Sequence, residues 1–182
     1  MRGDKILVLG DDTRGFLTIV RSLGRRGVVV HAAPANFRSP ALRSRYIDQI
    51  HHLPPWMADG AEWLTAITGL LRHQNYNLII PCNETTILPI QCHRTELAPF
   101  TRLAIPDDSI ITILFDKHET RELARSLEIP IAAGRLSRCG DEAEEVLREF
   151  GGQAVIKPRR SYSLERLGTR GKVQVLRDPQ LV

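Results

Sequence analysis

Two lysines in the second half of the chain stand at positions that suit the binding of an anion. Lys117 follows Asp116 at the predicted start of a helix, and Lys157 ends a predicted strand. A helix N-terminus attracts anions through its free N–H groups and its dipole, and a lysine there adds a full charge. A lysine at the end of a strand is a second charge, held by a sheet. The pair is therefore predicted to clamp a phosphate chain, with a mobile loop closing over it.

The segment that follows Lys157 is strongly basic. From Gln153 to Val182 there are two acids, Glu165 and Asp178, against seven bases: Lys157, Arg159, Arg160, Arg166, Arg170, Lys172 and Arg177. Such a segment suits a polyphosphate or a nucleic acid. A solvated basic loop without a ligand is an equally ordinary interpretation. The charge pattern by itself leaves these three interpretations open.

The composition predicts an ordinary globular protein outside the membrane. Of the 182 residues 42% are hydrophobic and 25% are charged, the formal charge is +4, and no apolar run is long enough to cross a bilayer. The N-terminus lacks the features of a secretory signal. The cysteines, Cys82, Cys92 and Cys139, have no C-x-x-C spacing. We therefore predict neither a disulfide framework nor a metal site, and we expect a reducing cytoplasm.

The elements that must position the two lysines begin with an alternation of strands and helices. Short apolar runs predict strands at 6–9, 28–31, 77–81 and 102–105, with a weaker one at 46–50. Apolar residues at helical spacing predict helices over 16–23, 63–71 and 85–97, the last despite Pro89. This order predicts an α/β fold, a Rossmann-like open sheet that is mostly parallel and has helices on both faces.

A second unit is predicted to begin after Phe115. Asp116 and Glu119 have the spacing of a capping box, at the start of a helix that ends before Ile129. A strand at 131–136, a helix capped by Asp141 and a strand at 154–157 follow, which makes a partial α+β subdomain. We therefore predict two domains, at 1–115 and 116–182.

The last residues of the sequence look like the start of another element. Asp178 and Pro179 are typical of a helix N-terminus, yet only three residues follow them. We therefore expect the sequence to be a fragment in which the second domain is truncated.

The turn after the first strand tests a dinucleotide-binding function. Residues 10–15, Gly-Asp-Asp-Thr-Arg-Gly, have the G-x-G-x-x-G spacing with Asp12 in place of the second glycine. That glycine lets a pyrophosphate approach the backbone, and a carboxylate there adds bulk and negative charge. The sequence also has no acid directly after the second predicted strand to hold a ribose hydroxyl. A dehydrogenase is therefore disfavoured.

An ordered set of short motifs resembles the ATP-grasp superfamily. Asp116-Lys117, Thr120 and Leu123-Ala124, then Leu-Glu-Ile-Pro at 127–130 and Ala-Val-Ile-Lys-Pro at 154–158, are similar to its carbamoyl-phosphate-synthase-like and amino-acid ligase branches. The first part, with Ile-Leu-Val-Leu-Gly at 6–10 and the turn from Ile80 to Glu84, resembles the pre-ATP-grasp domain. The resemblance covers the whole chain.

The resemblance implies a ligase that transfers the γ-phosphate of ATP to a carboxylate, after which an amine or another nucleophile attacks the acyl phosphate. It implies that Lys117 contacts the ATP phosphates and that Lys157 reaches the phosphates and the adenine edge. The loop from Arg159 and Arg160 to Gly171, which has fewer glycines than is usual in the family, would cover them. The Mg²⁺ ligands and the adenine hinge are expected beyond residue 182. No catalytic residue is therefore assigned, and the fragment alone is expected to be inactive.

Two turns at the carboxyl ends of strands are candidates for the substrate side of the site. They are Asp11 and Asp12 after the first strand, and Asn83 and Glu84 after the strand at 77–81. The alternative, that both turns only cap helices, is the favoured one.

The expected partners are a small carboxylate, an amine or other nucleophile, and the remainder of the ATP-grasp domain, and a homodimer is left open. Competing functions are a nucleic-acid-binding module built on the basic segment 157–177, a nucleotide-binding regulatory domain and a non-catalytic interaction domain. Nucleic-acid binding needs aromatic side chains among the bases, and Tyr162 is the single aromatic residue there. Nucleic acid is therefore a disfavoured partner.

Overall fold

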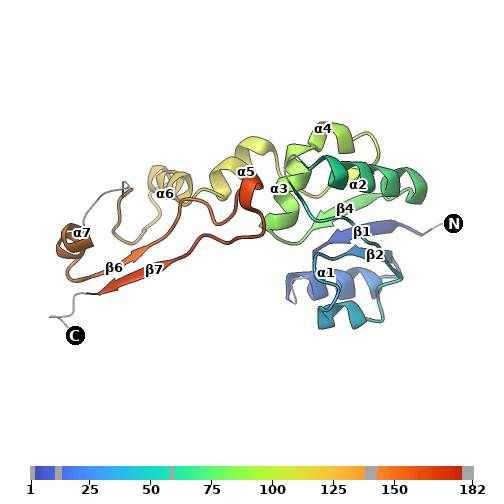
Figure 1. Cartoon of the computed structure of the whole chain (residues 1–182), viewed down its shortest axis with the longest axis horizontal. Coiled ribbons are helices and arrows are strands. Elements are labelled where there is room, and N and C mark those ends of the chain that lie inside the picture. Colours follow the sequence, from blue (N-terminus) through green and yellow to red (C-terminus); the bar gives the residue numbers. More distant parts are fainter. Residues whose placement is uncertain (1–2, 11–13, 58–59, 138–142, 178–182) are drawn as a thin grey trace. The chain divides into compact units, whose positions relative to one another are not determined.

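The computed structural model describes residues 3–10, 14–57, 60–137 and 143–177, and the chain divides into two compact units (Figure 1). The first unit holds Met1–Pro106 and takes in Leu164–Gly168, and the second holds Asp107–Ser163 and Thr169–Val182. Helix α5 (Asp108–Leu114) precedes the predicted boundary at 115/116, and it groups with the second unit.

The first unit is built on a five-stranded parallel sheet, which confirms the predicted α/β fold. Its strands are β1 (Lys5–Leu9), β2 (Val29–Ala33), β3 (Gln49–Ile50), β4 (Leu78–Pro81) and β5 (Arg102–Leu103). They lie in the order β3-β2-β1-β4-β5, and each neighbouring pair is parallel. Leu7 and Val8 of the central strand β1 are 0% exposed. A continuous apolar run forms such a strand because both faces of a parallel sheet are covered.

Helices cover both faces of this sheet (Figure 1). Phe16 and Val20 of α1 (Gly15–Gly24) share one core with Val8, while Ile67 of α2 (Ala61–Gln74) shares the other core with Leu7. Successive side chains of a strand point to opposite faces, so β1 contributes to both cores. Burying each side chain of this size stabilises the fold by roughly 1.5–3 kcal/mol.

The minor elements of the first unit are shorter than the sequence predicted. The helix predicted over 85–97 is two helices, α3 (Glu84–Cys92), which contains Pro89, and α4 (Arg94–Leu97). The strands predicted at 46–50 and 102–105 are reduced to the two-residue strands β3 and β5. Both lie at the edges of the sheet, where a strand pairs with only one neighbour. A 3-10 helix, η1 (Pro40–Arg43), lies between β2 and β3.

A buried polar cluster joins three segments of the first unit. His31 Nδ1 lies 2.9 Å from His51 Nε2 and 2.8 Å from Tyr76 Oη, and that hydroxyl lies 3.0 Å from His51 Nε2. Burial, followed by the charges of His51 and Lys5, lowers the pKa of His31 to about 4, although Asp48 raises it. Burial and Lys5 also lower the pKa of His51. His31 is therefore neutral at pH 7, as burial in a core requires.

Two tryptophans form an aromatic cluster in the first unit. The ring centroids of Trp56 and Trp63 lie 5.7 Å apart, and Trp56 lies 5.6 Å from the ring of His93. The indole N–H of Trp56 donates to the carbonyl of Leu164 at 3.1 Å, within the segment that belongs to this unit. Gly60 has φ 75°, and a Cβ there would lie 2.4 Å from the Trp56 ring, so this turn requires glycine.

The second unit contains an antiparallel ribbon and three helices among its described residues. Strands β6 (Gln153–Ile156) and β7 (Gln174–Arg177) pair with Val155 opposite Val175. Helices α5, α6 (Lys117–Ser126) and α7 (Ala143–Glu149) lie before the ribbon in the chain. This is the partial α+β arrangement that the sequence predicted, with β7 and α5 as elements that the sequence analysis missed.

The strand predicted at 131–136 is wrong. Residues 131–137 contain no strand, since the sheet of the second unit pairs β6 with β7 and this segment has no strand partner among the described residues. Its carbonyls instead accept hydrogen bonds from the guanidinium of Arg121, which donates to those of Ala132 and Gly134, both at 3.1 Å. The caps predicted at Asp141 and Asp178 lie outside the described residues.

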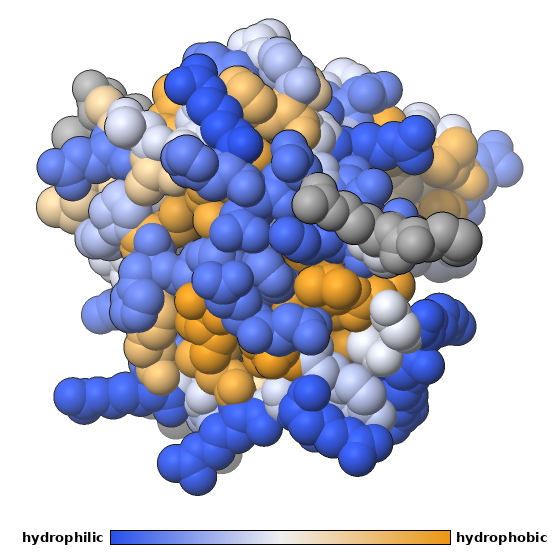
Figure 2. Space-filling view, turned by 90° about the vertical axis from the view of Figure 1, so that its right-hand side faces the viewer, coloured by the Kyte–Doolittle hydropathy of each residue, from blue (hydrophilic) through white to orange (hydrophobic). Residues whose placement is uncertain are grey.

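Among the described residues, no helix is long and apolar enough to cross a membrane. The face turned toward the viewer in Figure 2, on the side where the N-terminus lies in Figure 1, is mostly hydrophilic, with hydrophobic side chains visible between the charged ones.

Candidate functional site

The start of α6 is fixed by Asp116, as the sequence predicted. One carboxylate oxygen of Asp116, Oδ1, accepts hydrogen bonds from the amides of His118 at 3.0 Å and Glu119 at 3.3 Å. The amide of Asp116 itself donates to Ile113 O at 3.3 Å, and the side chain of Glu119 turns to Arg159. The cap is therefore confirmed. The predicted capping box is not formed, because the carboxylate of Glu119 contacts Arg159 and not the amide of Asp116. Lys117 occupies the first position of the helix.

The structure brings both predicted lysines to one cavity. Lys157 follows the last residue of β6 and is exposed, and its ammonium makes no hydrogen bond or ion pair with the described residues. The Lys117 ammonium lies 3.2 Å from Ser161 Oγ and 3.5 Å from Arg159 O, in the segment just after Lys157. The amide of Lys117 donates to the same Arg159 carbonyl at 2.9 Å. Helix start and loop are thus joined directly.

The cavity has a volume of about 1180 Å³ and lies within the second unit. Val146 of α7 and Phe150 give it apolar walls, with α6 and residues 132–137 around it. Its lining holds one carboxylate, Glu122, and six basic side chains: Lys117, Arg121, Arg125, Arg135, Lys157 and Arg159. Ligand sites typically measure about 300–1,000 Å³ and combine apolar walls with a few polar groups. Arg125, Arg135 and Arg159 already contact carboxylates. The remaining three bases form no ion pair with the described residues, and unmatched positive charge in such a cavity favours an anion.

Arg159 and Arg160 differ in how closely carboxylates approach their guanidinium groups. The guanidinium of Arg159 lies 2.7 Å from Asp116 Oδ2 and 2.9 Å from Glu119 Oε1, while Arg160 Nε lies 3.7 Å from Asp116 Oδ2. Burial raises the pKa of Asp116, but the hydrogen bonds from Arg159 and from the two amides outweigh burial and hold the pKa below its usual value. The hydrogen bond to Asp116 raises the pKa of Arg159.

Of the turns predicted to face a substrate, the one after β4 acts as a helix cap. Asn83 Oδ1 accepts from the Thr86 amide at 3.2 Å, and Thr86 Oγ1 lies 3.3 Å from the Asn83 amide, a complete capping box. The carboxylate of Glu84 is half-buried and makes no hydrogen bond or ion pair with the described residues. Asp11 and Asp12 lie outside the described residues. Glu84 is thus the described candidate whose side chain is available.

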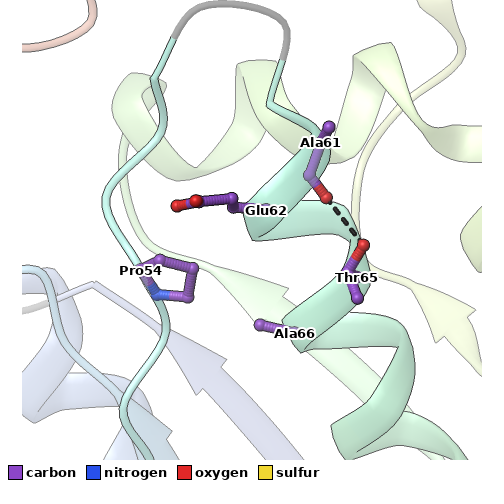
Figure 3. Close-up of a pocket in the computed structure, with 5 residues that line it drawn as sticks. All are labelled: Pro54, Ala61, Glu62, Thr65 and Ala66. Carbon is purple, nitrogen blue, oxygen red and sulfur yellow. Dashed lines mark hydrogen bonds between the residues drawn. The ribbon is translucent and has the colours of Figure 1, made fainter.

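A second hollow, of about 440 Å³, lies on α2 in the first unit (Figure 3). Pro54, Ala61, Glu62, Thr65 and Ala66 line it, and the Thr65 hydroxyl donates to Ala61 O at 2.9 Å. Its described lining contains one charged side chain, the carboxylate of Glu62. A carboxylate without a basic partner in the lining does not suit a phosphate, so this hollow is not the anion site.

Metal ligands are absent from the part of the chain that the structure describes. No three His, Cys, Asp or Glu side chains there come together in a way that could hold a metal ion.

Two contacts within the candidate site are not predicted by the sequence. Asp116 was recognised as a cap but not as the partner of Arg159, and Ser161 was not singled out as a neighbour of Lys117. The spacing of these residues in the sequence carries no periodic signal, because the contacts join a helix start to a loop after the next strand. The sequence gives one indication of these contacts: Asp116-Lys117 is a run of opposite charges, and Arg159-Arg160 is a run of like charges.

Comparison with solved structures finds this fold in larger enzymes. An ADP complex of N5-carboxyaminoimidazole ribonucleotide synthetase has a TM-score of 0.65 at 16% identity, over 98% of this chain and 42% of its own. The enzyme of that name from Thermotoga maritima gives 0.59 at 17% identity, over 97% and 42%. A biotin carboxylase domain dimer from Hydrogenobacter thermophilus 2-oxoglutarate carboxylase, solved with MgADP and bicarbonate, gives 0.59 at 15% identity, over 96% and 38%.

These neighbours are ATP-grasp enzymes, and this chain has the fold of their N-terminal portion. It spans about two fifths of their length, as the coverages of 42%, 42% and 38% show. No protein-family model matches the sequence, and no curated protein matches it by sequence similarity.

Proposed function

We propose that the second unit binds the phosphates of ATP. The observation that carries the proposal is the convergence of Lys117 and Lys157 on one cavity, where neither ammonium forms an ion pair with the described residues. Lysine charges at a helix start and a strand end would neutralise a phosphate chain, and charge neutralisation of this kind is the main contribution that a protein makes to phosphoryl transfer. Arg159 and Arg160 are proposed to add to the positive charge of the site. The fold of the ATP-grasp enzymes supports this proposal.

The protein to which this chain belongs is proposed to be an ATP-dependent carboxylate–amine ligase. A carboxylate oxygen of the substrate would attack the γ-phosphorus, and ADP would leave. The amine, or another nucleophile, would then attack the acyl carbon and expel phosphate. Both substrates are proposed to be small molecules, and Glu84, at the carboxyl end of β4, is proposed to contact one of them. The remainder of an ATP-grasp domain is the proposed partner of the second unit, and it would supply the groups that hold Mg²⁺.

Calorimetric titration of ATP into the protein tests the phosphate site. Replacing Lys157 by Ala removes a charged contact worth about 1.5–3 kcal/mol, so ATP affinity should fall about ten- to hundredfold. Lys172→Ala is the matched control, because Lys172 is also exposed but does not line the cavity, and it should change the affinity less than about threefold.

Two results would count against the proposal. Equal losses for Lys157→Ala and Lys172→Ala would indicate attraction by the general charge of the basic segment. Salt-sensitive binding of random RNA that ATP does not compete for would favour the nucleic-acid module instead.

A further inference from the structure

Asp116 does more than a helix cap requires. A cap needs one side-chain acceptor, and Asp116 Oδ1 fills that role for the amides of His118 and Glu119. Its carboxylate also holds the guanidinium of Arg159 on both oxygens, with Nε 3.1 Å from Oδ1 and Nη2 2.7 Å from Oδ2. The Asp116 side chain is 3% exposed, whereas that of Arg159 is 48% exposed. A two-pronged bond of this kind fixes orientation as well as distance.

The main chain of Arg159 carries this fixed geometry to Lys117. The Arg159 carbonyl accepts from the Lys117 amide at 2.9 Å and lies 3.5 Å from its ammonium. Ser161 Oγ, two residues further, lies 3.2 Å from the same ammonium, and Ser161 O accepts from the Gly171 amide at 2.8 Å. A closed chain of contacts therefore runs from the Asp116 carboxylate through Arg159 to Lys117, the residue that follows Asp116 in the sequence.

We infer that Asp116 is the positioning residue of the nucleotide site and acts through Arg159 to set the place of the Lys117 ammonium. A free lysine side chain loses conformational entropy when a ligand fixes it. Tethering the ammonium to Ser161 and to the Arg159 carbonyl removes part of that loss before the phosphates arrive. The inference rests on the proposed function and names a residue that the site needs besides its phosphate ligands.

The charges around Arg159 show why its main contribution is position. Its Nη2 already lies within 2.9 Å of two carboxylates, so a phosphate would have to replace partners that match its charge. The Lys157 ammonium has no such partner among the described residues. The two lysines and Arg121 are therefore the cations of the cavity lining that no carboxylate of the described residues matches, and Arg159 holds one of the lysines in place.

The decisive variant is Asp116→Asn. Asparagine keeps an oxygen that can cap α6, but it loses the charge and places an NH₂ group against a guanidinium. If Asp116 acts as a positioning residue, Asp116→Asn should weaken ATP binding by about tenfold in calorimetry, the size of coupling seen within one hydrogen-bonded network. Glu119→Gln is the matched control, since Glu119 also contacts Arg159 Nη2 but is 45% exposed, and it should change the affinity less than about threefold.

A double-mutant cycle separates positioning from general damage to the fold. In a Lys117→Met background the ammonium is absent, so Asp116→Asn should cause no further loss of ATP affinity. Equal losses in both backgrounds would show that Asp116 acts independently of Lys117 and would overturn the inference. Unchanged ATP affinity for Asp116→Asn alone would show that Asp116 serves only as a helix cap, and it would overturn the inference. Tighter binding would mean that Asp116 competes with the phosphates for Arg159, and it would overturn the inference as well.

Amide hydrogen exchange tests the same path without a nucleotide. The Lys117 amide donates to Arg159 O, so Asp116→Asn should speed its exchange at least tenfold, while the amides of His118 and Glu119 stay protected by the retained cap. Unchanged exchange at Lys117 would overturn the inference. If the wild-type protein does not bind ATP but Asp116→Asn still causes this exchange pattern, the proposed function is overturned and the contact path from Asp116 to Lys117 stands.

Discussion

In the first unit the central strand β1 is buried on both faces, whereas in the second unit Val155 of β6 and Val175 of β7 are 55% and 60% exposed. The first unit encloses two apolar cores. In the second, the residues that carry the candidate site are joined by an ion pair and hydrogen bonds around Asp116. The difference indicates that apolar burial stabilises the first unit, whereas polar contacts fix the local geometry of the candidate site in the second.

The largest expected effect is a loss of stability when a buried apolar side chain is removed from the first unit, and an exposed one in the second unit is the comparison. Ile79 of β4 is 0% exposed and Ile129 in the second unit is 51% exposed. Ile79→Ala should lower the free energy of unfolding by about 2–5 kcal/mol. Ile129→Ala should change it by less than about 0.5 kcal/mol. Urea denaturation followed by circular dichroism measures both, and similar losses would contradict the contrast between the units.

A smaller effect is expected from removing the polar centre of the second unit. Asp116→Ala deletes the cap of α6 and should cost about 1–2 kcal/mol, visible as faster amide exchange at His118 and Glu119. Asn83→Ala removes the corresponding cap of α3 and is the control in the first unit. Each substitution should expose the amides of its own helix. Exposure of α6 by Asn83→Ala would show that the caps are not local.

The buried histidines predict a pH dependence that belongs to the first unit. The pKa of His31 is lowered to about 4 from 6.5, so between these values the unfolded chain binds more protons than the folded one. Stability should therefore be complete above pH 6.5 and decline as the pH falls toward 4. His51, whose pKa is also lowered, acts in the same direction. Thermal unfolding between pH 4 and 7 measures the decline, and His31→Gln should make it shallower. A stability that rises on acidification would refute this prediction.

The smallest effect is expected on the open face of the ribbon. Val175→Thr replaces one β-branched side chain by another at an exposed position, and it should change the free energy of unfolding by less than about 0.5 kcal/mol. Val30→Thr is the matched substitution in β2, where the side chain is 0% exposed and an added hydroxyl would lack water. A loss at Val175 as large as that at Val30 would show that the ribbon face is covered in solution.

How far the sequence predicts the structure follows the same division. The apolar runs of β1, β2 and β4 predict the sheet because burial on two faces leaves a strong pattern. Strand β7, with the sequence Gln-Val-Leu-Arg, leaves a weak one. The false strand at 131–136 shows that an apolar run forms no strand without a partner strand, and two of its carbonyls bind Arg121 instead.

The candidate site is only partly predictable for a related reason. Position in an element identifies Lys117 and Lys157, since a helix start and a strand end are local features of the sequence. The contact of Asp116 with Arg159 depends instead on how α6 packs beside the end of β6, and no local pattern encodes that packing.

The aromatic cluster of the first unit has an optical consequence. The chain contains two tryptophans, and both Trp56 and Trp63 lie in the first unit. Intrinsic tryptophan fluorescence therefore reports on the first unit. Because the Trp56 indole N–H bonds to Leu164 O, its emission should respond when the segment Leu164–Gly168 detaches. The molecule thus carries a built-in spectroscopic reporter for one short piece of the basic loop.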